Sequence, residues 1–184
     1  ISKISLFFLN FFQVDPLKKV LKEQAYFRDV VDTVRVARGE TASVQIVVKG
    51  LVGIENMRAR VIDVSSVSSK LTGTTGWVGY VHVGRSYNPP SKDIIRSASG
   101  YFPDPILPDS AFSIEQGEVQ PLWVSVPTTA STSPGLYKGQ VEITGKIGKE
   151  NKRWRKDFYI RVYPVTLQKS PLLITNWSAH FSPI

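Results

Sequence analysis

The sequence predicts an all-β domain, built as an antiparallel β-sandwich with little helix. Short segments alternate apolar and polar residues with a period of two, which is the pattern of half-buried strands. The 13 glycines and 12 prolines are spread along the chain, which suits many short strands and turns better than long helices. With 184 residues, of which 42% are hydrophobic and 21% charged, the chain can bury a core of its own. It contains no cysteine, which excludes disulfides, thiolate metal sites and cysteine nucleophiles.

The N-terminal part predicts an arm or first strand with a linker over residues 1–33. Residues 4–12 (ISLFFLNFF) are as apolar as the core of a secretion signal, but no small-residue cleavage site follows, which favours an ordered strand over a signal remnant. Residues 16–23 (PLKKVLKE) follow Asp15, a good helix cap, so they predict either a short helical turn or a bulged strand.

From residue 34 onward the β pattern becomes regular. Segments with the alternation of half-buried strands span residues 34–38, 42–48, 57–64, 77–83, 121–126, 137–144 and 158–162. In the segment 42–48 one face carries the apolar residues Ala42, Val44, Ile46 and Val48. This spacing predicts a sandwich of immunoglobulin-like or jelly-roll-like kind over residues 34–168.

The segments between the strands predict turns and loops. Residues 85–100 predict a long irregular excursion, because two consecutive prolines lack the donors of a central strand. Residues 102–108 (FPDPILP) predict a proline-rich turn, in which Asp104 and the nearby Asp109 act as turn formers.

The densest basic cluster, residues 146–156 (KIGKENKRWRK), predicts a solvated hairpin tip. Trp154 lies between two arginines there, so we expect it to be exposed or to lie along the hairpin. In the strand before this tip, Gln140 and Glu142 alternate with apolar residues and are expected to face water.

No constellation of reactive residues is visible. The two histidines, His82 and His180, lie far apart without ligand spacing, and there is no G-x-S-x-G, phosphate-binding or dinucleotide motif. We therefore expect no catalytic residue, no cofactor and no metal. The formal charge of +8 is interpreted as a solvated basic surface, so nucleic acid is not expected as a partner. No apolar run reaches the roughly 18 residues of a membrane span.

Four aromatic residues are candidates for contact with a ligand or another domain, namely Trp123, Trp77, Tyr87 and Trp177. Trp123 is the strongest candidate, because it alternates with Leu122 and Val124 and is expected to point outward. An outward tryptophan can stack on a sugar ring or contact a neighbouring domain.

A resemblance to a known family is carried by segments spread over residues 34–184. They are VARGETASVQIVV (36–48), YFPDPILP (101–108), QPLWV (120–124), SPGLYKGQV (133–141) and VYPVTL (162–167) followed by Pro171. In this order they resemble the N-terminal β-sandwich of glycoside hydrolase family 123 proteins. Gly39 departs from the family pattern, which usually has a larger polar residue there.

The resemblance implies a non-catalytic accessory domain that supports or shapes a catalytic TIM barrel. Residues 169–184 would then begin that missing barrel domain. The implied family activity is hydrolysis of glycans containing N-acetylgalactosamine, with an Asp-Glu pair in the barrel. No catalytic residue can be carried over to this chain.

A secreted, periplasmic or cell-surface location is expected. The alternative is a free-standing carbohydrate-binding or adhesion module, with a glycan as partner.

Overall fold

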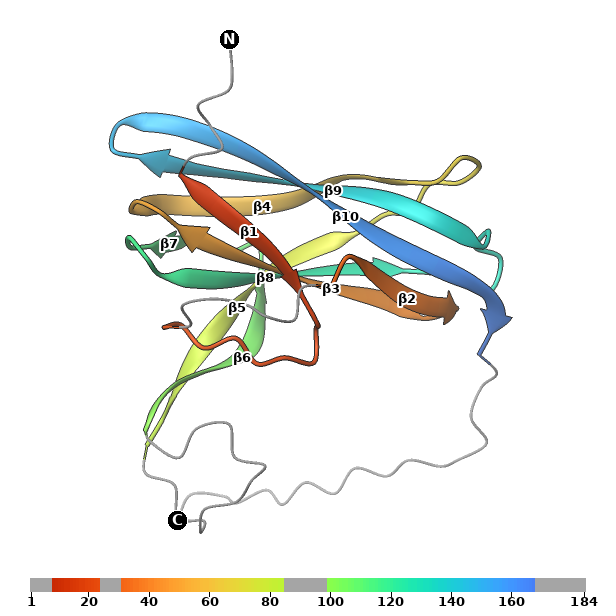
Figure 1. Ribbon diagram of the computed structural model, residues 1–184, viewed down its shortest axis with the longest axis horizontal. Helices are drawn as coiled ribbons and strands as arrows, with labels where there is room; N and C mark the ends of the chain where they lie inside the picture. Colours follow the sequence, from red (N-terminus) through yellow and green to blue (C-terminus); the bar gives the residue numbers. More distant parts are fainter. Residues whose placement is uncertain (1–7, 24–30, 85–98, 168–184) are drawn as a thin grey trace.

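The computed structural model describes residues 8–23, 31–84 and 99–167, which form two stacked β-sheets (Figure 1). Each sheet has five strands. The first contains, in spatial order, β1 (Leu9–Val14), β3 (Thr41–Gly50), β8 (Val119–Pro127), β5 (Thr74–Val83) and β6 (Gly100–Pro108). The second contains β2 (Thr33–Arg38), β10 (Glu150–Thr166), β9 (Gly135–Ile147), β4 (Ile54–Ser65) and β7 (Phe112–Ile114). The described residues contain no helix, so the predicted all-β sandwich is confirmed.

The strand pairs are antiparallel apart from β2 and β10, which run parallel. A parallel pair needs a long connection, and here β3 to β9 lie between the two strands in the chain. The first sheet begins with β1, which pairs with β3 over its whole length, from Leu9 opposite Gly50 to Val14 opposite Gln45.

The core lies between the two sheets and follows the predicted alternation. Inward rows come from β3, β8 and β10, and their fully buried members include Val44, Ile46, Leu122, Val124, Phe158 and Ile160. Each such side chain contributes about 1.5–3 kcal/mol by leaving water. The core is therefore made from the residues that the period of two selects.

One core contact depends on a glycine. Gly139 in β9 lies directly opposite Phe158 in β10. A Cβ atom added at Gly139 would come within 2.1–2.6 Å of three atoms of the Phe158 ring. The phenyl ring therefore covers the glycine, and no larger residue fits at position 139 without displacing it.

The segment after β1 is neither the helical turn nor the bulged strand that the sequence predicted. Residues 16–23 form turns, starting where the Leu17 amide donates to the Asp15 carboxylate over 2.8 Å. The Gln45 side-chain amide in β3 donates to the carbonyls of Asp15 and Lys18, each over 3.0 Å. Because these carbonyls bond to a side chain, the segment is tied to the sheet in a non-helical form.

The proline-rich segment is a strand, and the prediction of a turn was wrong. Residues 100–108 form β6 at the edge of the first sheet, paired with β5. Prolines are tolerated on edge strands because one side of the strand needs no amide donors. Asp104 is therefore not a turn former but an exposed strand residue, whose carboxylate lies 4.0 Å from the Lys19 ammonium. Asp109, just beyond β6, has φ 51° and does act as a turn residue.

The basic hairpin is mostly strand. Its turn consists of Gly148 and Lys149, and Gly148 has φ 57°, as the first position of a type II′ turn requires. The expectation that Trp154 is exposed was wrong, because it is only 4% exposed and packs in the core. The alternation of β10 simply continues through the basic cluster, so Trp154 falls on the inward face with Phe158.

Candidate functional site

Trp123 lies on the outer face of the first sheet, as predicted from its position between Leu122 and Val124. It is half-buried and lines a cavity of about 170 Å³, together with Gln45 and Asp104. The turns at residues 16–19 form another wall of this cavity. The Lys19 ammonium donates to the Pro103 carbonyl over 3.2 Å and so joins these turns to β6. The indole of Trp123 is therefore partly covered by the chain itself.

Of the other three aromatic candidates, the structure describes only Trp77. Trp77 is 2% exposed and packs in the core, where its ring lies 6.1 Å from that of Phe112, so it offers no open face for stacking. The sequence did not reveal this burial, because β5 carries apolar residues on both of its faces. Tyr87 and Trp177 lie outside the described residues, as does the excursion at residues 85–98.

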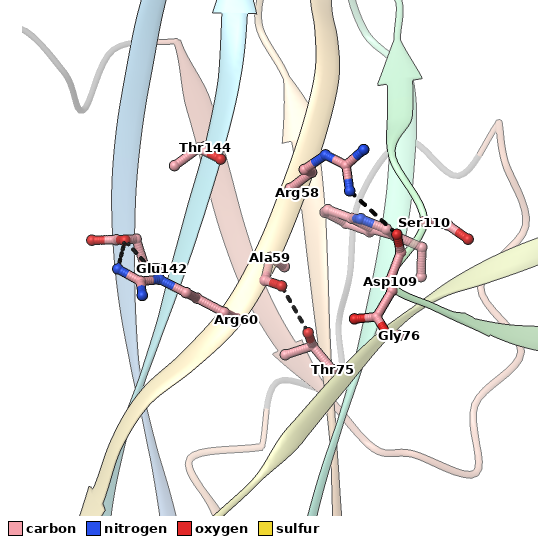
Figure 2. Close-up of a pocket in the computed structure, with 10 residues that line it drawn as sticks. Arg58, Ala59, Arg60, Thr75, Gly76, Asp109, Ser110, Glu142 and Thr144 are labelled. Atoms are coloured by element: carbon pink, nitrogen blue, oxygen red, sulfur yellow. Dashed lines mark hydrogen bonds and ion pairs between the residues drawn. The ribbon is translucent and has the colours of Figure 1, made fainter.

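A second cavity, of about 300 Å³, lies where β4, β5 and β9 meet the turn after β6 (Figure 2). Its walls are formed by Arg58, Ala59, Arg60, Thr75, Gly76, Trp77, Asp109, Ser110, Glu142 and Thr144. The Thr75 hydroxyl donates to the Ala59 carbonyl over 2.9 Å, and the Arg58 guanidinium donates to the Asp109 carbonyl over 3.3 Å. These two bonds connect β4 to β5 and to the turn at Asp109.

The wall of this cavity contains a polar group that lacks a partner. The indole N–H of Trp77 is buried and makes no hydrogen bond to any described residue. A buried donor without a partner is uncommon and costs free energy. Trp77 lines the cavity, but this nitrogen has almost no accessible surface, so the N–H does not face the open space.

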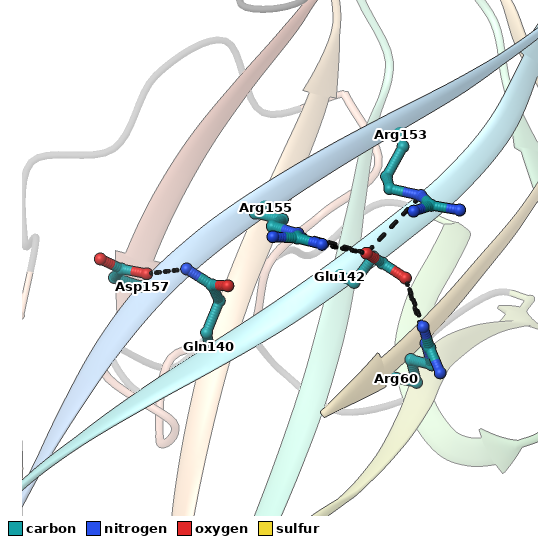
Figure 3. A network of polar contacts seen from close by, with 6 residues as sticks. All are labelled: Arg60, Gln140, Glu142, Arg153, Arg155 and Asp157. Atoms are coloured by element: carbon teal, nitrogen blue, oxygen red, sulfur yellow. Dashed lines mark hydrogen bonds and ion pairs between the residues drawn. The ribbon is translucent and has the colours of Figure 1, made fainter. Parts of the chain in front are cut away.

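Glu142 is the centre of a polar network on the outer face of the second sheet (Figure 3). Its carboxylate accepts two hydrogen bonds from Arg60, at 3.1 and 2.8 Å, and two from Arg155, both at 3.2 Å. Arg153 Nε lies 3.6 Å from the same carboxylate. The arginines come from β4 and β10, which flank β9, and Arg60 and Arg155 pair directly with Glu142 in the register.

The prediction that Glu142 faces water was wrong, because its side chain is only 2% exposed. It does lie on the outer face, but the three arginine side chains cover it. The hydrogen bonds from Arg60, and then those from Arg155 and the charge of Arg153, lower the pKa of Glu142 below its ordinary value of 4.5, against the effect of burial. The carboxylate is thus held charged inside a cluster of three cations.

A smaller set of contacts continues along the same face. The Gln140 side-chain amide donates to Asp157 over 2.6 Å, and the Lys138 ammonium lies 2.6 Å from the other oxygen of that carboxylate. These bonds lower the pKa of Asp157. The outer face of β9 and β10 is therefore organised by cross-strand polar pairs.

The described residues hold no group of three His, Asp or Glu side chains that could bind a metal ion. His82 is exposed, and its ring meets the edge of the Tyr101 ring at 5.3 Å. In the described part of the chain, no helix has the length and apolar character needed to span a membrane.

Comparison with known proteins decides the family. A family model described as the glycoside hydrolase 123 N-terminal domain matches residues 20–145, which is more than half of the chain. The chain belongs to the glycoside hydrolase 123 N-terminal domain family. The family predicted from the sequence segments is thereby confirmed.

One solved structure agrees on the fold, and two other proteins show a more limited similarity. A family 123 glycoside hydrolase from Clostridium perfringens aligns with a TM-score of 0.59 at 16% identity, over 84% of this chain and 27% of that one. The CooA pilin subunit from enterotoxigenic Escherichia coli aligns with a TM-score of 0.41 at 13% identity, over 87% of this chain and 99% of that one. A lectin from Lablab purpureus is 34% identical over 84 residues, which is 44% of this chain and 34% of the lectin. The chain thus spans about a third or less of the length of the hydrolase and of the lectin.

The departure of Gly39 from the family pattern has a local explanation. Gly39 lies in the turn between β2 and β3 with φ 87°, a conformation that favours glycine. Its amide donates to the Thr128 hydroxyl over 3.0 Å, and that hydroxyl lies 2.7 Å from the Glu40 carbonyl, to which it donates. The turn is therefore fixed by Thr128, which directly follows β8.

Proposed function

We propose that this domain is a non-catalytic accessory domain of a glycoside hydrolase 123-type protein, in which it supports a catalytic domain. The family match over residues 20–145 carries the proposal. The alignment with the Clostridium perfringens hydrolase supports it, because most of this chain corresponds to only 27% of that enzyme. The described residues offer cross-strand ion pairs and packed strands, which are the features of a scaffold.

One surface fits a contact with such a catalytic domain. The paired strands β5 and β6 extend away from the stacked layers at one end (Figure 1). They carry exposed apolar residues, namely Val81, Val83, Tyr101, Ile106 and Leu107. Tyr101 lies opposite His82 and shares its face, whereas Val81 and Val83 lie on the other face of the ribbon. Apolar side chains exposed on a projecting ribbon are typical of an interaction site. We propose that this β5–β6 surface contacts the catalytic domain.

The accessory role can be tested at two levels. The purified chain alone should not hydrolyse an aryl N-acetylgalactosaminide, and measurable turnover would overturn the proposal. In a longer protein that joins this domain to a hydrolase domain, Val81→Asp combined with Tyr101→Asp should separate the two unfolding transitions and expose the junction to protease. Val67→Asp, at an exposed site in the loop before β5, is the matched control and should leave a single transition.

A carbohydrate-binding or adhesion module is the second candidate. It is favoured by the cavity beside Trp123 and by the partial similarity to a lectin. Binding on a glycan array that is lost in Trp123→Ala would support it, and no binding across the array would count against it. Either role goes with a secreted, periplasmic or cell-surface location, which fractionation of the producing cell would test.

A further inference from the structure

Two cavities lined by cations lie beside Arg58, one at the junction of β4 and β5 and one over the hairpin of β9 and β10. The 300 Å³ cavity at Arg58 and Arg60 shares Arg58 and Thr144 with a neighbouring cavity of about 530 Å³. The neighbouring cavity is lined by Asn56, Arg58, Thr144, Gly145, Lys146, Asn151, Lys152 and Arg153. The two cavities therefore share part of their lining, and we call them together the Arg58 groove.

The lining of the Arg58 groove has an excess of positive charge. Its cationic members are Arg58, Arg60, Lys146, Lys152 and Arg153, and its carboxylates are Glu142 and Asp109. Glu142 already bonds to Arg60 and Arg155 and lies beside Arg153. One carboxylate thus offsets three guanidinium groups, and the cluster keeps a net positive charge at neutral pH.

Several of these cations are held in place before any ligand arrives. Arg60 and Arg153 are fixed by the buried Glu142 carboxylate, yet their side chains remain 71% and 63% exposed. Arg58 is fixed by the Asp109 carbonyl. Cations that are positioned in advance lose little conformational entropy on binding an anion, which favours recognition over loose charge attraction.

One further group defines what else the ligand must carry. The Asp109 carboxylate accepts no hydrogen bond from another described side chain, and it points toward the Thr75 side of the cavity (Figure 2). A carboxylate in that place repels a bare anion but accepts hydrogen bonds from hydroxyl groups. The ligand therefore needs one anionic group and, close to it, hydroxyl groups.

We propose that the Arg58 groove binds an acidic saccharide, a sugar chain that carries carboxylate or sulfate groups. Its anionic group lies against Arg58, and its hydroxyl groups donate to Asp109. A cavity of about 300 Å³ is of the size that holds a small ligand, and the second cavity continues the path for a neighbouring unit. This site lies on a different face from Trp123 and does not depend on the accessory role.

The test is a titration of the isotope-labelled chain followed by NMR, at 150 mM salt so that diffuse attraction is screened. The probes are a trimer of galacturonic acid, a sulfated disaccharide, neutral maltotriose, inorganic sulfate and a short single-stranded DNA. An acidic saccharide should shift the backbone amide signals of Arg58 and Asp109 with saturation, and maltotriose should not. Comparison of the two acidic probes shows whether the groove takes a carboxylate or a sulfate.

Two variants test the assigned contacts. Arg58→Gln should weaken binding by about tenfold or more, because a hydrogen bond to a charged group is lost. Asp109→Asn should weaken saccharide binding but leave the response to inorganic sulfate unchanged or stronger, and asparagine tolerates the positive φ. Arg161→Gln, an exposed change elsewhere on β10, is the control and should bind as the parent does.

The proposal is overturned by equal binding of maltotriose, by unchanged binding in Arg58→Gln, or by shifts that grow without saturation for every anion. Tighter binding of the DNA than of either saccharide would also overturn it and would identify the groove as a nucleic-acid surface. Binding of inorganic sulfate with no response to either saccharide would reduce the site to a simple anion site and contradict the role of Asp109.

Discussion

Replacing Glu142 by glutamine tests whether the arginine network holds the second sheet together. The substitution keeps the size of the side chain but removes its charge. It also places an amide that donates hydrogen bonds among three guanidinium groups that only donate. The carboxylate at present accepts four hydrogen bonds at 2.8–3.2 Å from Arg60 and Arg155, so the variant loses acceptors on the strand between β4 and β10.

The expected loss of stability depends on how far Glu142 and its arginine partners are buried. A hydrogen bond to a charged group contributes about 1.5–3 kcal/mol to stability, whereas an exposed ion pair contributes about 0–1 kcal/mol. Glu142 is covered, but the Arg60 and Arg155 side chains are 71% and 54% exposed, which places the network between these limits. We expect Glu142→Gln to lower the free energy of unfolding by about 1–2 kcal/mol. For a domain of this size that corresponds to a fall in Tm of about 2–8 °C.

The lowered pKa of Glu142 determines how the stability difference between the parent and Glu142→Gln changes with pH. The arginines hold the pKa of Glu142 below its ordinary value of 4.5. A lowered pKa in the folded state means that the stabilisation is fully present above pH 4.5 and is lost as the pH falls through the folded-state pKa. The stability difference between the parent and Glu142→Gln should therefore be constant from pH 7 to 5 and should shrink below pH 4.5.

Urea unfolding at pH 7, 5, 4 and 3 measures this difference. Glu150→Gln is the matched control, because the side chain of Glu150 is exposed and pairs with Lys152 at the hairpin turn. It should unfold within about 0.5 kcal/mol of the parent, as surface changes usually do. The reasoning is refuted if Glu142→Gln is as stable as the parent at pH 7, or if its deficit is the same at pH 3 as at pH 7.

Three further substitutions probe single contacts, each measured by urea unfolding. Gly139→Ala should cost about 1–3 kcal/mol, because its Cβ would overlap the Phe158 ring, and Gly53→Ala, whose nearest contact would be an ordinary 3.8 Å, should cost clearly less. Thr128→Val should cost about 1–3 kcal/mol, since the Gly39 amide loses its acceptor; an unchanged midpoint would contradict this. Tyr137→Phe should cost about 1 kcal/mol, because its hydroxyl donates to the Ser133 carbonyl over 2.7 Å, and a neutral result would show that water replaces this bond.

The sequence predicted the sandwich and most of its inward rows, because those depend on a local signal with a period of two. It failed where a segment's place in the sheet matters more than its composition. The prolines of β6 predicted a turn, but an edge position tolerates them. The basic cluster predicted a loop, but charges on the outer face of β10 leave the inward face free for Trp154.

The candidate groove was beyond reach of the sequence for a related reason. Glu142 was expected to face water because strand alternation assigns a face but not what covers that face. Its partners Arg60 and Arg155 come from strands on either side, and the order β4, β9, β10 in the sheet is not visible in the chain. A search for opposite charges after pairing the strands would have found the network, since both pairs are directly in register.

Glu142 affects both the stability of the sheet and the binding proposed for the Arg58 groove, whereas Arg58 is expected to affect binding alone. Variants at the two positions should therefore differ in their effects. Arg58 bonds only to the Asp109 carbonyl among the contacts described for it, so its loss should weaken saccharide binding with little effect on unfolding. Glu142 positions Arg60 and Arg153 from beneath, so its loss should lower stability while raising the net charge of the groove. If preorganisation dominates, Glu142→Gln binds the acidic saccharide more weakly despite its extra positive charge. If charge alone dominates, the same variant binds more tightly, and the groove is then an electrostatic surface and not a built site.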